Sequence, residues 1–330
     1  MKLSTLSLSA CVESLRDVTP TVRELSLRLS ADAPLAASRW QPGAHLQVQL
    51  LIRGQLQARH YSLLPCDVPG LLKIAVKRAD PGRGGSQAMW QLQVGDALSI
   101  GALRNQFALD LTAPAYLLIA GGIGITPLIS MAQQLVQRGA NVKMIYGARD
   151  AQELAFLSEL RGLLGDQLHI AIGSTIDFTS MIEHLPLLAQ AYVCGPAGML
   201  NAARKAWATT HRPDALLRFE TFGGGGEAHS FQVKLPRHDL AFDVLPHMSL
   251  LDAIEQQGVV AMYGCRRGEC GLCAVNVLSL EGQIDHRDVF FSEHEKRSNA
   301  QICVCVSRVQ GRISLDSAYR PDAQSEAKTA

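Results

Sequence analysis

Three closely spaced cysteines near the C-terminus constrain the fold more than any other feature of the chain. Cys265, Cys270 and Cys273 follow the pattern C-x4-C-x2-C, with Gly268 and Gly271 between them. A plant-type loop holds a 2Fe–2S cluster with this spacing when a fourth cysteine comes from a distant segment. The glycines fit because the backbone must wrap closely around the inorganic core and can need a positive φ. The chain is therefore predicted to bind a 2Fe–2S cluster.

The residue pattern leaves the fourth cluster ligand open. Cys303 and Cys305 stand two apart in a segment that alternates like a strand, so both side chains point to the same face. A structural zinc site usually shows two short C-x2-C pairs, and a disulfide framework belongs to small secreted chains. Eight cysteines in 330 residues therefore favour the cluster over either alternative.

Length and charge limit the classes of protein. With 330 residues the chain is long enough for two or three domains, and a formal net charge of +1 gives no basic surface for nucleic acid. The longest apolar stretch, residues 115–132, contains three glycines and a proline, so it is predicted as strand, loop and helix and not as a membrane span. Residues 6–12 alternate like a strand and lack the apolar centre of a signal sequence. We expect a cytoplasmic protein without lipid or disulfides.

The first part of the chain predicts an antiparallel β-barrel. Short apolar runs alternate with polar residues and are separated by Gly and Pro turns, which is typical of small barrels. The predicted strands are 6–12, 22–29, 45–52, 60–64 and 72–76. A single short helix is expected at 86–92. We assign residues 1–110 to this domain.

From about residue 111 the pattern changes to strands alternating with helices, which predicts a doubly wound parallel sheet over 111–222. The predicted strands are 115–120, 142–146, 168–172, 191–194 and 216–220, and the predicted helices are 127–138, 152–160, 179–185 and 198–210. The glycine-rich residues 223–230 are predicted as a flexible linker. Residues 231–330 are predicted as an α+β domain that carries the cysteines, with a disordered tail from about residue 321.

A glycine-rich turn in the second domain predicts a dinucleotide site. Gly122 and Gly124 follow a strand and precede a helix. Thr126 can cap this helix and Pro127 fits its first position, while the free N–H groups would meet a pyrophosphate. Because Pro127 stands where the G-x-G-x-x-G fingerprint has its third glycine, the turn alone fits a merely tight turn equally well.

A second turn, Cys194-Gly195-Pro196, follows the predicted strand 191–194. Ligands of open α/β sheets bind at the carboxyl ends of the strands, so this turn is expected beside the first. At the end of another strand, Asp150 would favour the ribose hydroxyl of NADH, whereas Arg149 would favour the extra phosphate of NADPH. The two residues therefore predict different coenzymes, and we favour NADH.

The redox chemistry requires a flavin between the nicotinamide and the cluster, because one transfers electrons in pairs and the other singly. In the barrel, Arg59 could pair with a phosphate, Tyr61 could stack on the ring, and Ser62 could hydrogen-bond its edge. Without this redox argument, Arg59 and Tyr61 would be interpreted as ordinary strand residues. The candidate flavin-binding residues are Arg59, His60, Tyr61, Ser62, Val76, Lys77, Gly84, Gly85 and Ser86.

In this order, the motifs resemble those of the phthalate dioxygenase reductase family, which includes vanillate demethylase reductase subunits. The similarity covers residues 6–315, nearly the whole chain. Its markers are Arg59-x-Tyr61-Ser62, Gly84-Gly85-Ser86, Arg104-Asn105-x-Phe107, residues 121–127, Cys194-Gly195-Pro196, Phe219-Glu220-x-Phe222, the cysteine loop, residues 285–288 and Cys305-Val306-Ser307-Arg308.

The resemblance implies three domains: a flavin barrel, an NAD domain and a plant-type ferredoxin domain of the β-grasp fold. It implies FMN as the flavin, since the barrel has no evident element to hold an adenine, and it points to Cys305 as the fourth cluster ligand. By the same resemblance, Phe222 would pack against the flavin ring and Thr126 would approach its edge. Cys194 would lie near the nicotinamide.

The resemblance also implies a function. Members of the family reduce Rieske oxygenases that act on aromatic acids or small quaternary amines, so electrons would pass from NADH to FMN, to the 2Fe–2S cluster and then to an oxygenase partner. The alternatives are the reductase of a di-iron hydroxylase and a redox sensor without turnover. Arg266 and Arg267 flank the cysteine loop and are expected to meet an acidic partner surface.

Overall fold

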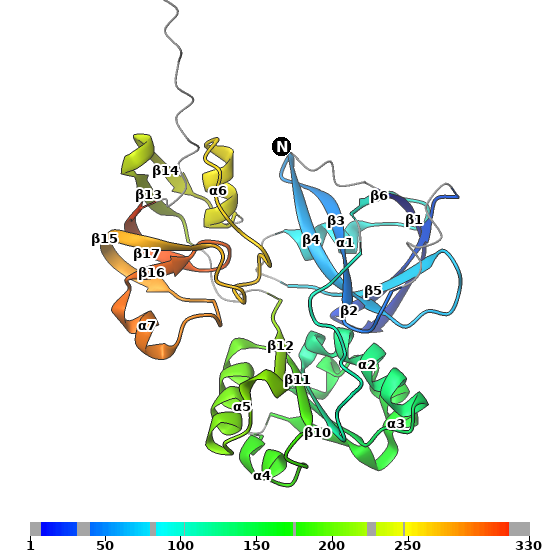
Figure 1. Ribbon diagram of the computed structural model, residues 1–330. Coiled ribbons are helices and arrows are strands. Elements are labelled where there is room, and N and C mark those ends of the chain that lie inside the picture. Colours follow the sequence, from blue (N-terminus) through cyan, green and yellow to red (C-terminus); the bar gives the residue numbers. More distant parts are fainter. Residues whose placement is uncertain are drawn as a thin grey trace, which may run out of the picture. The chain divides into compact units, whose positions relative to one another are not determined.

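The computed structural model describes residues 8–31, 40–79, 84–101, 103–173, 176–222, 229–246 and 248–316. The chain divides into two compact units, Met1–Glu220 and Thr221–Ala330 (Figure 1). The predicted disordered tail and most of the predicted linker lie outside the described residues. None of the helices within these ranges is long and apolar enough to cross a membrane.

The first unit begins with a closed antiparallel barrel. Its strands are β1 (Leu8–Thr19), β2 (Val22–Leu29), β3 (Ala44–Ile52), β4 (Gln55–Leu64), β5 (Leu71–Lys77), β6 (Ala97–Ile100) and β7 (Arg104–Asn105), with the short helix α1 (Gly85–Gln91). They follow the order β4-β5-β2-β1-β6-β3-β7, and an additional β3–β4 pairing closes the sheet. The predicted barrel is therefore confirmed.

Strand β1 is longer than the sequence predicts, because its second half is polar and does not alternate. Asp17 and Arg16 pair in register with Arg23 and Glu24 of β2. The side chains form ion pairs of 2.6 Å for Arg23–Asp17 and 3.0 Å for Arg16–Glu24. Opposite charges directly across two strands stabilise the pairing, so charge complementarity takes the place of apolar burial here.

The rest of the first unit is a five-stranded parallel sheet in the order β10-β9-β8-β11-β12. Its strands are β8 (Tyr116–Gly121), β9 (Val142–Ala148), β10 (Leu168–Ile172), β11 (Gln190–Cys194) and β12 (Leu217–Glu220), and its helices are α2 (Ile125–Gln137), α3 (Leu157–Leu164), α4 (Phe178–Glu183) and α5 (Ala197–Thr209). Helices α2 and α3 cover one face and α4 and α5 the other (Figure 1). The strand order reverses between β8 and β11, which confirms the doubly wound fold and fixes its switch point.

The helix predicted at 152–160 is wrong at both ends. Residues Ala151–Glu153 form a single 3-10 turn that Asp150 caps, and α3 begins only at Leu157. Phe156 precedes it with φ 60°, a left-handed conformation that no helix interior adopts. A break of this kind depends on tertiary packing, since Phe156 is buried in the core.

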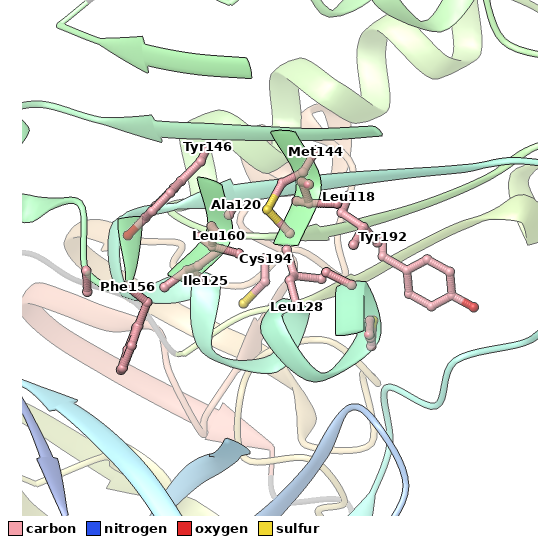
Figure 2. Packing of buried hydrophobic residues seen from close by; sticks show 14 of the residues in the cluster. Leu118, Ala120, Ile125, Leu128, Met144, Tyr146, Phe156, Leu160, Tyr192 and Cys194 are labelled. Carbon is pink, nitrogen blue, oxygen red and sulfur yellow. The ribbon is translucent and has the colours of Figure 1, made fainter. Parts of the chain in front are cut away.

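Barrel and parallel sheet share one apolar core. Figure 2 shows part of it, with Leu118 and Met144 of the sheet packed against Ile125 and Leu128 of α2. The same cluster includes buried barrel residues, among them Leu64 of β4. Because α2 also packs directly on β4, the two parts form one compact unit, although the sequence predicts them as two domains. The predicted boundaries at 110 and 222 stay predictions.

The second unit is a mixed five-stranded sheet with a helix on one face. Its elements are β13 (Phe231–Leu235), β14 (Leu240–Val244), α6 (Leu250–Gln256), β15 (Ala274–Asp285), α7 (Glu293–Ser298), β16 (Gln301–Cys303) and β17 (Arg308–Asp316). The strand order is β14-β13-β17-β15-β16, with β13 and β17 parallel. Leu250, Leu251 and Ile254 of α6 are buried in its core. This is the predicted β-grasp arrangement.

Candidate cofactor sites

Two glycine-containing turns meet at the switch point of the parallel sheet. A Cβ atom on Gly124 would lie 2.2 Å from the carbonyl oxygen of Cys194, and one on Gly121 would lie 2.6 Å from Cδ of Pro196. A Cβ on Gly195 would in turn lie 3.1 Å from the backbone of Gly121. Only glycine permits such close backbone approach. The structure thus places the two turns side by side at the edge where open α/β sheets bind their ligands.

Helix α2 starts earlier than the sequence predicts. Gly122–Gly124 already form a 3-10 turn, so that Gly124 takes the N-cap position and Ile125 is the first helical residue. Thr126 does not cap the helix: its hydroxyl donates to the carbonyl oxygen of Ile123 at 3.0 Å. The predicted capping role of Thr126 and the predicted first position of Pro127 are therefore wrong, because the 3-10 turn brings the chain into helical geometry sooner. A helix N-terminus at this edge still offers N–H groups to an anion.

The residues expected to choose between the two nicotinamide coenzymes are both exposed, beyond the end of β9. One carboxylate oxygen of Asp150 accepts a 2.8 Å hydrogen bond from the Gln152 N–H. Within the described part of the chain, the Arg149 side chain has neither a hydrogen bond nor an ion pair. The preference for NADH stays a prediction.

In the barrel, Arg59 of β4 lies against the start of α1. A Cβ atom on Gly85 would stand 2.5 Å from its Nε, so a side chain at this position would collide with the guanidinium. Arg59 also donates to the Ala58 carbonyl oxygen at 2.9 Å and to Gln57 Oε1 at 2.8 Å. Gly84, at φ 84°, turns the chain into the helix. Five N–H donors on a planar guanidinium suit a phosphate, so these residues fit the phosphate end of FMN.

Ser62, on the same strand β4, is a buried polar residue of the barrel. Ser62 is 4% exposed, and its hydroxyl has no hydrogen-bond partner among the described residues. A buried hydroxyl without a partner is rare in native proteins and fits a missing ligand. Tyr61 of the same strand is half-buried and packs against the barrel core. The unpartnered Ser62 hydroxyl fits a ring held at this point.

Other predicted flavin-binding residues are engaged within the chain. Lys77 forms a 2.8 Å ion pair with Glu153, and the carbonyl oxygen of Val76 accepts a 3.1 Å hydrogen bond from the Trp90 ring. The Ser86 hydroxyl accepts from the Ala79 N–H at 3.1 Å. His60 lies 5.3 Å, ring to ring, from His45. Their roles toward a flavin stay predictions.

The flavin-site strands and the dinucleotide turn contact each other within the first unit. Helix α2 packs on β4, and the 3-10 turn at Gly122–Gly124 contacts β5. Cys194 is fully buried in the core (Figure 2), so a nicotinamide would meet its backbone before its thiol. Thr126 is also buried. Phe222 is 40% exposed and belongs to the second unit, just beyond its first residue.

The cysteine loop of the second unit lies between α6 and β15. Gly268 has φ 76° and Gly271 has φ 72°, and a Cβ on Gly271 would stand 2.3 Å from the Phe290 ring. The N–H groups of Arg267 and Glu269 point at the Cys265 sulfur, at 3.3 and 3.4 Å. Backbone N–H groups directed at a cysteine sulfur stabilise a thiolate, the form in which cysteine binds a metal.

Both candidates for the fourth ligand lie beside Cys273. The thiols of Cys303 and Cys305 hydrogen-bond to its sulfur, the latter at 3.2 Å, and lower the pKa of Cys273 to about 3. Cys303 is held in β16, in register with Ala274 of β15. Cys305 faces the loop, since the Gly268 N–H donates to its sulfur. Cys305 remains the predicted ligand, and this loop contact favours it.

The described residues contain no group of three His, Cys, Asp or Glu side chains gathered closely enough to hold a single metal ion. A binuclear cluster divides its four thiolates between two irons, so its ligands need not converge on one point. All eight cysteines are free of disulfide bonds. The loop therefore fits a 2Fe–2S cluster by its spacing, its glycines and its inward N–H groups.

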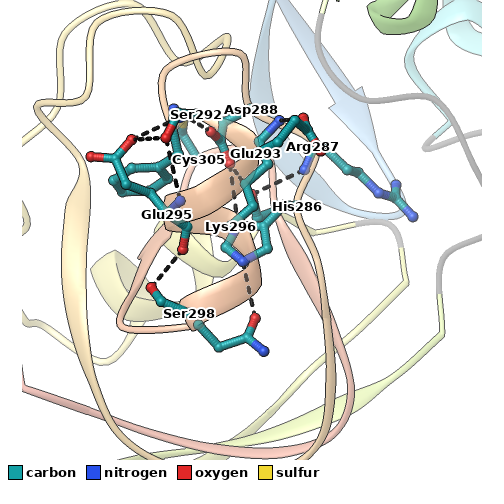
Figure 3. Close-up of polar contacts among 12 residues, drawn as sticks. His286, Arg287, Asp288, Ser292, Glu293, Glu295, Lys296, Ser298 and Cys305 are labelled. Carbon is teal, nitrogen blue, oxygen red and sulfur yellow. Dashed lines mark hydrogen bonds and ion pairs between the residues drawn. The ribbon is translucent and has the colours of Figure 1, made fainter.

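A buried carboxylate, Asp288, lies in the segment next to the cluster loop, and Figure 3 shows polar contacts around it. Asp288 is 1% exposed and accepts hydrogen bonds from the Ser307 hydroxyl at 3.1 Å and from the Phe291 N–H at 3.0 Å. Burial alone would raise its pKa, but these bonds and the neighbouring His286 ring lower the pKa of Asp288. Val289 N–H donates to the Gly268 carbonyl oxygen. The sequence marks residues 285–288 only as a motif, and nothing in their spacing signals this support.

The two arginines of the loop already have partners in the chain. Arg266 forms 2.7 Å ion pairs with Asp252 and Glu255 and lies 4.0 Å from the centre of the Tyr263 ring. Arg267 is buried and pairs with Glu269 at 3.3 Å. These contacts weigh against the expectation that both arginines meet an acidic partner, because each would have to give up an internal carboxylate.

Two family models match parts of this chain, and three relatives are similar to most of it. Residues 118–171 match the oxidoreductase NAD-binding domain, and residues 234–310 match the 2Fe-2S iron-sulfur cluster binding domain. A putative toluene-4-sulfonate monooxygenase system reductase subunit of Comamonas testosteroni is 36% identical over 92% of this chain and 97% of its own. The heme-dependent oxidative N-demethylase beta subunit of Ectopseudomonas mendocina is 34% identical over 92% and 96%.

The third relative is similar in both sequence and structure. Phthalate dioxygenase reductase of Burkholderia cepacia is 35% identical over 72% of this chain and 76% of its own. A solved phthalate dioxygenase reductase, described as a modular structure for electron transfer from pyridine nucleotides to [2Fe-2S], covers 94% of this chain and 98% of its own at 32% identity, with a TM-score of 0.75. Barrel, parallel sheet and β-grasp unit thus recur in one known chain.

Proposed function

Because the chain belongs to the phthalate dioxygenase reductase family, we propose that it is the NADH-dependent reductase component of a two-component oxygenase. In this proposal electrons enter from NADH at the parallel sheet, pass through FMN in the barrel to the 2Fe–2S cluster, and leave to the oxygenase. The reductase subunits among the relatives support this direction of transfer.

One observation carries the entry side of the proposal: the dinucleotide turn and the flavin-site strands contact each other within a single unit. Gly122–Gly124 contacts β5, and α2 packs on β4. A nicotinamide ring held at the turn therefore has a short route to a flavin held by β4. FMN, when bound, supplies the conversion of an electron pair into single electrons.

Within this entry site, the chain's own residues bind and orient. The guanidinium of Arg59 and the start of α1 would hold the FMN phosphate. The unpartnered Ser62 hydroxyl would hydrogen-bond the ring, and the half-buried Tyr61 would cover one side of it. The paired turns at Gly124 and Gly195 would receive the pyrophosphate and nicotinamide of NADH.

On the exit side, Cys265, Cys270, Cys273 and Cys305 would hold the cluster, and Gly268 and Gly271 would let the backbone approach it. A plant-type cluster has a reduction potential of about −400 mV, whereas that of a Rieske centre is about −150 mV or above. Electron transfer to a Rieske oxygenase would therefore be downhill. We propose a cytoplasmic location, because the cluster thiols must stay reduced before assembly.

The oxygenase partner is proposed to be of the Rieske type. The named relatives serve systems of different chemistry, since one is called a subunit of a heme-dependent demethylase. A di-iron hydroxylase is the closest alternative acceptor. Reconstitution with a purified oxygenase of each type separates the two acceptors. The proposal expects NADH oxidation coupled to product formation with a Rieske oxygenase. Reduction of only a different type of metal centre would contradict it.

Turnover itself is tested with the reductase alone. Protein loaded with FMN and cluster should oxidise NADH steadily while it reduces an artificial one-electron acceptor such as cytochrome c. A redox sensor would carry the same cofactors but would stop after one reduction. Absence of steady turnover in fully loaded protein would favour the sensor and contradict the reductase.

A further inference from the structure

Two sequence motifs of the second unit, residues 285–288 and 305–308, are joined by buried hydrogen bonds. Ser307 stands two residues after Cys305, the predicted fourth ligand. Its hydroxyl donates to Asp288 Oδ1 at 3.1 Å and accepts from the Arg287 N–H at 3.2 Å. Asp288 and Ser307 are each 1% exposed. Hydrogen bonds shielded from water in this way are stronger than surface ones, so they hold the two motifs firmly together.

The same segment, residues 287–289, also contacts the cysteine loop. The Val289 N–H donates to the Gly268 carbonyl oxygen at 2.9 Å. A Cβ atom on Gly268 would stand 2.9 Å from Cα of Asp288, so the backbones of loop and segment are in direct contact. Segment 287–289 therefore binds Gly268 by its backbone and Ser307 by its backbone and its carboxylate.

Ser307 belongs to the tight turn that carries the predicted ligand. The N–H groups of Val306 and Ser307 both donate to the Cys303 carbonyl oxygen, at 3.3 and 3.1 Å. A turn closed by two such bonds transmits a shift of Ser307 to Cys305. On the opposite side, the Gly268 N–H donates to the Cys305 sulfur. Loop, segment and turn thus form a closed ring of hydrogen bonds around this sulfur.

The bond from the Gly268 N–H to the Cys305 sulfur bears directly on electron transfer. Hydrogen bonds to the sulfurs are among the factors that set the reduction potential of an iron–sulfur cluster. A donor directed at a ligand sulfur stabilises the reduced cluster most, because the reduced form carries more negative charge. Loss of alignment between this N–H and the sulfur would therefore lower the potential.

We propose that Asp288 and Ser307 are positioning residues for the fourth cluster ligand. By fixing the turn against the loop, they keep the Cys305 sulfur aligned with the Gly268 N–H and so raise the reduction potential of the cluster. All of these contacts lie within the second unit. The inference rests on the proposed function, in which Cys305 is a ligand of a 2Fe–2S cluster.

The experiment is a redox titration of the cluster in FMN- and cluster-loaded protein, read from the electron paramagnetic resonance signal of the reduced cluster. Ser307→Ala removes the hydroxyl and should lower the equilibrium constant for one-electron reduction about tenfold, the size of one buried hydrogen bond. This corresponds to a potential lower by about 59 mV. Ser307→Thr keeps the hydroxyl and should keep the wild-type potential. NADH should reduce the flavin of both variants as it does in the wild type.

A matched control removes a hydroxyl elsewhere in the same unit. The Ser298 hydroxyl donates to the Glu295 carbonyl oxygen at 2.7 Å on the exposed helix α7, so Ser298→Ala should leave the potential unchanged. An unchanged potential in Ser307→Ala, or an equal decrease in Ser298→Ala, would overturn the inference.

A second variant decides if Ser307→Ala does not assemble a cluster. Asp288→Asn removes one of the two carboxylate acceptors and also a negative charge. A lower potential supports positioning, whereas a higher potential would show that Asp288 acts through its charge alone and would overturn the inference. Retention of the cluster in Cys305→Ser would show instead that the ligand assignment in the proposed function is wrong.

Discussion

The entry site and the exit site for electrons are built in opposite ways. The exit site is one loop, residues 263–273, completed by a single cysteine from another segment. The entry site combines β4, β5 and α1 of the barrel with α2 and two turns of the parallel sheet, so its parts come from segments far apart in the chain. The loop can be recognised by spacing alone, whereas the entry site exists only once two sheets have folded against each other.

The difference also lies in what the glycines do. In the loop, Gly268 and Gly271 have positive φ, which lets the backbone turn sharply between the cysteines. At the entry site, Gly124 and Gly195 let two strands end in direct backbone contact. The first kind of glycine follows from a local motif, and the second follows from the sheet order β8-β11. A motif therefore predicts the exit site, and topology predicts the entry site.

The largest expected effect concerns the exit site. Cys305→Ser should abolish the cluster, because one of four thiolate ligands is lost, while NADH should still reduce the flavin. Cys303→Ser is the matched variant and should keep the cluster, since Cys303 is held in β16. Iron and acid-labile sulfide measured with the visible spectrum check both. Bleaching by Cys303→Ser alone would show that the ligand assignment is wrong.

At the entry site, Gly124→Ala should destabilise the first unit by about 1–3 kcal/mol, the usual cost of overpacking. The added Cβ would lie 2.2 Å from a backbone oxygen of the neighbouring turn, which has no freedom to move away. Gly162→Ala in α3 is the control, since nothing lies within 4 Å of its Cβ position. Thermal unfolding of both variants is the measurement. Equal melting temperatures would contradict the close contact of the turns.

A smaller effect is expected for the phosphate end of the flavin site. Arg59→Ala should weaken FMN binding about tenfold or more, the value of one hydrogen bond to a charged group. Arg161→Ala, an exposed residue of α3, serves as the control. Equilibrium dialysis with FMN measures both affinities. Unchanged FMN affinity in Arg59→Ala would count against its role.

The smallest effect concerns salt. Because Arg266 and Arg267 are paired within the chain, partner reduction should change by no more than about twofold between low and physiological ionic strength. Met262, Leu272 and Phe290, in and beside the loop, are exposed apolar residues. A steep decrease of the rate with salt would restore the expectation of an acidic partner surface.

Most of the fold was predictable from the sequence, and most of the misses have a tertiary cause. The alternation of apolar and polar residues predicts the barrel, and the order of strands and helices predicts the doubly wound sheet. Neither pattern predicts that β4 and α2 share a core. The start of α2 was misplaced because Gly122–Gly124 turn helically before Thr126. Of the candidate sites, the cysteines followed from spacing. The buried contacts of Asp288 did not, because polar contacts between distant segments leave no periodic signal.

The central claim is that paired electrons from NADH are separated in the first unit and leave singly through iron in the second. Anaerobic addition of NADH to purified, cofactor-loaded protein tests it most directly, with flavin absorbance and the electron paramagnetic resonance spectrum recorded on the same sample. We expect the flavin absorbance to bleach and the signal of a reduced 2Fe–2S cluster to develop with it. Protein that contains zinc without acid-labile sulfide, or whose cluster stays oxidised while the flavin is reduced, would contradict the account.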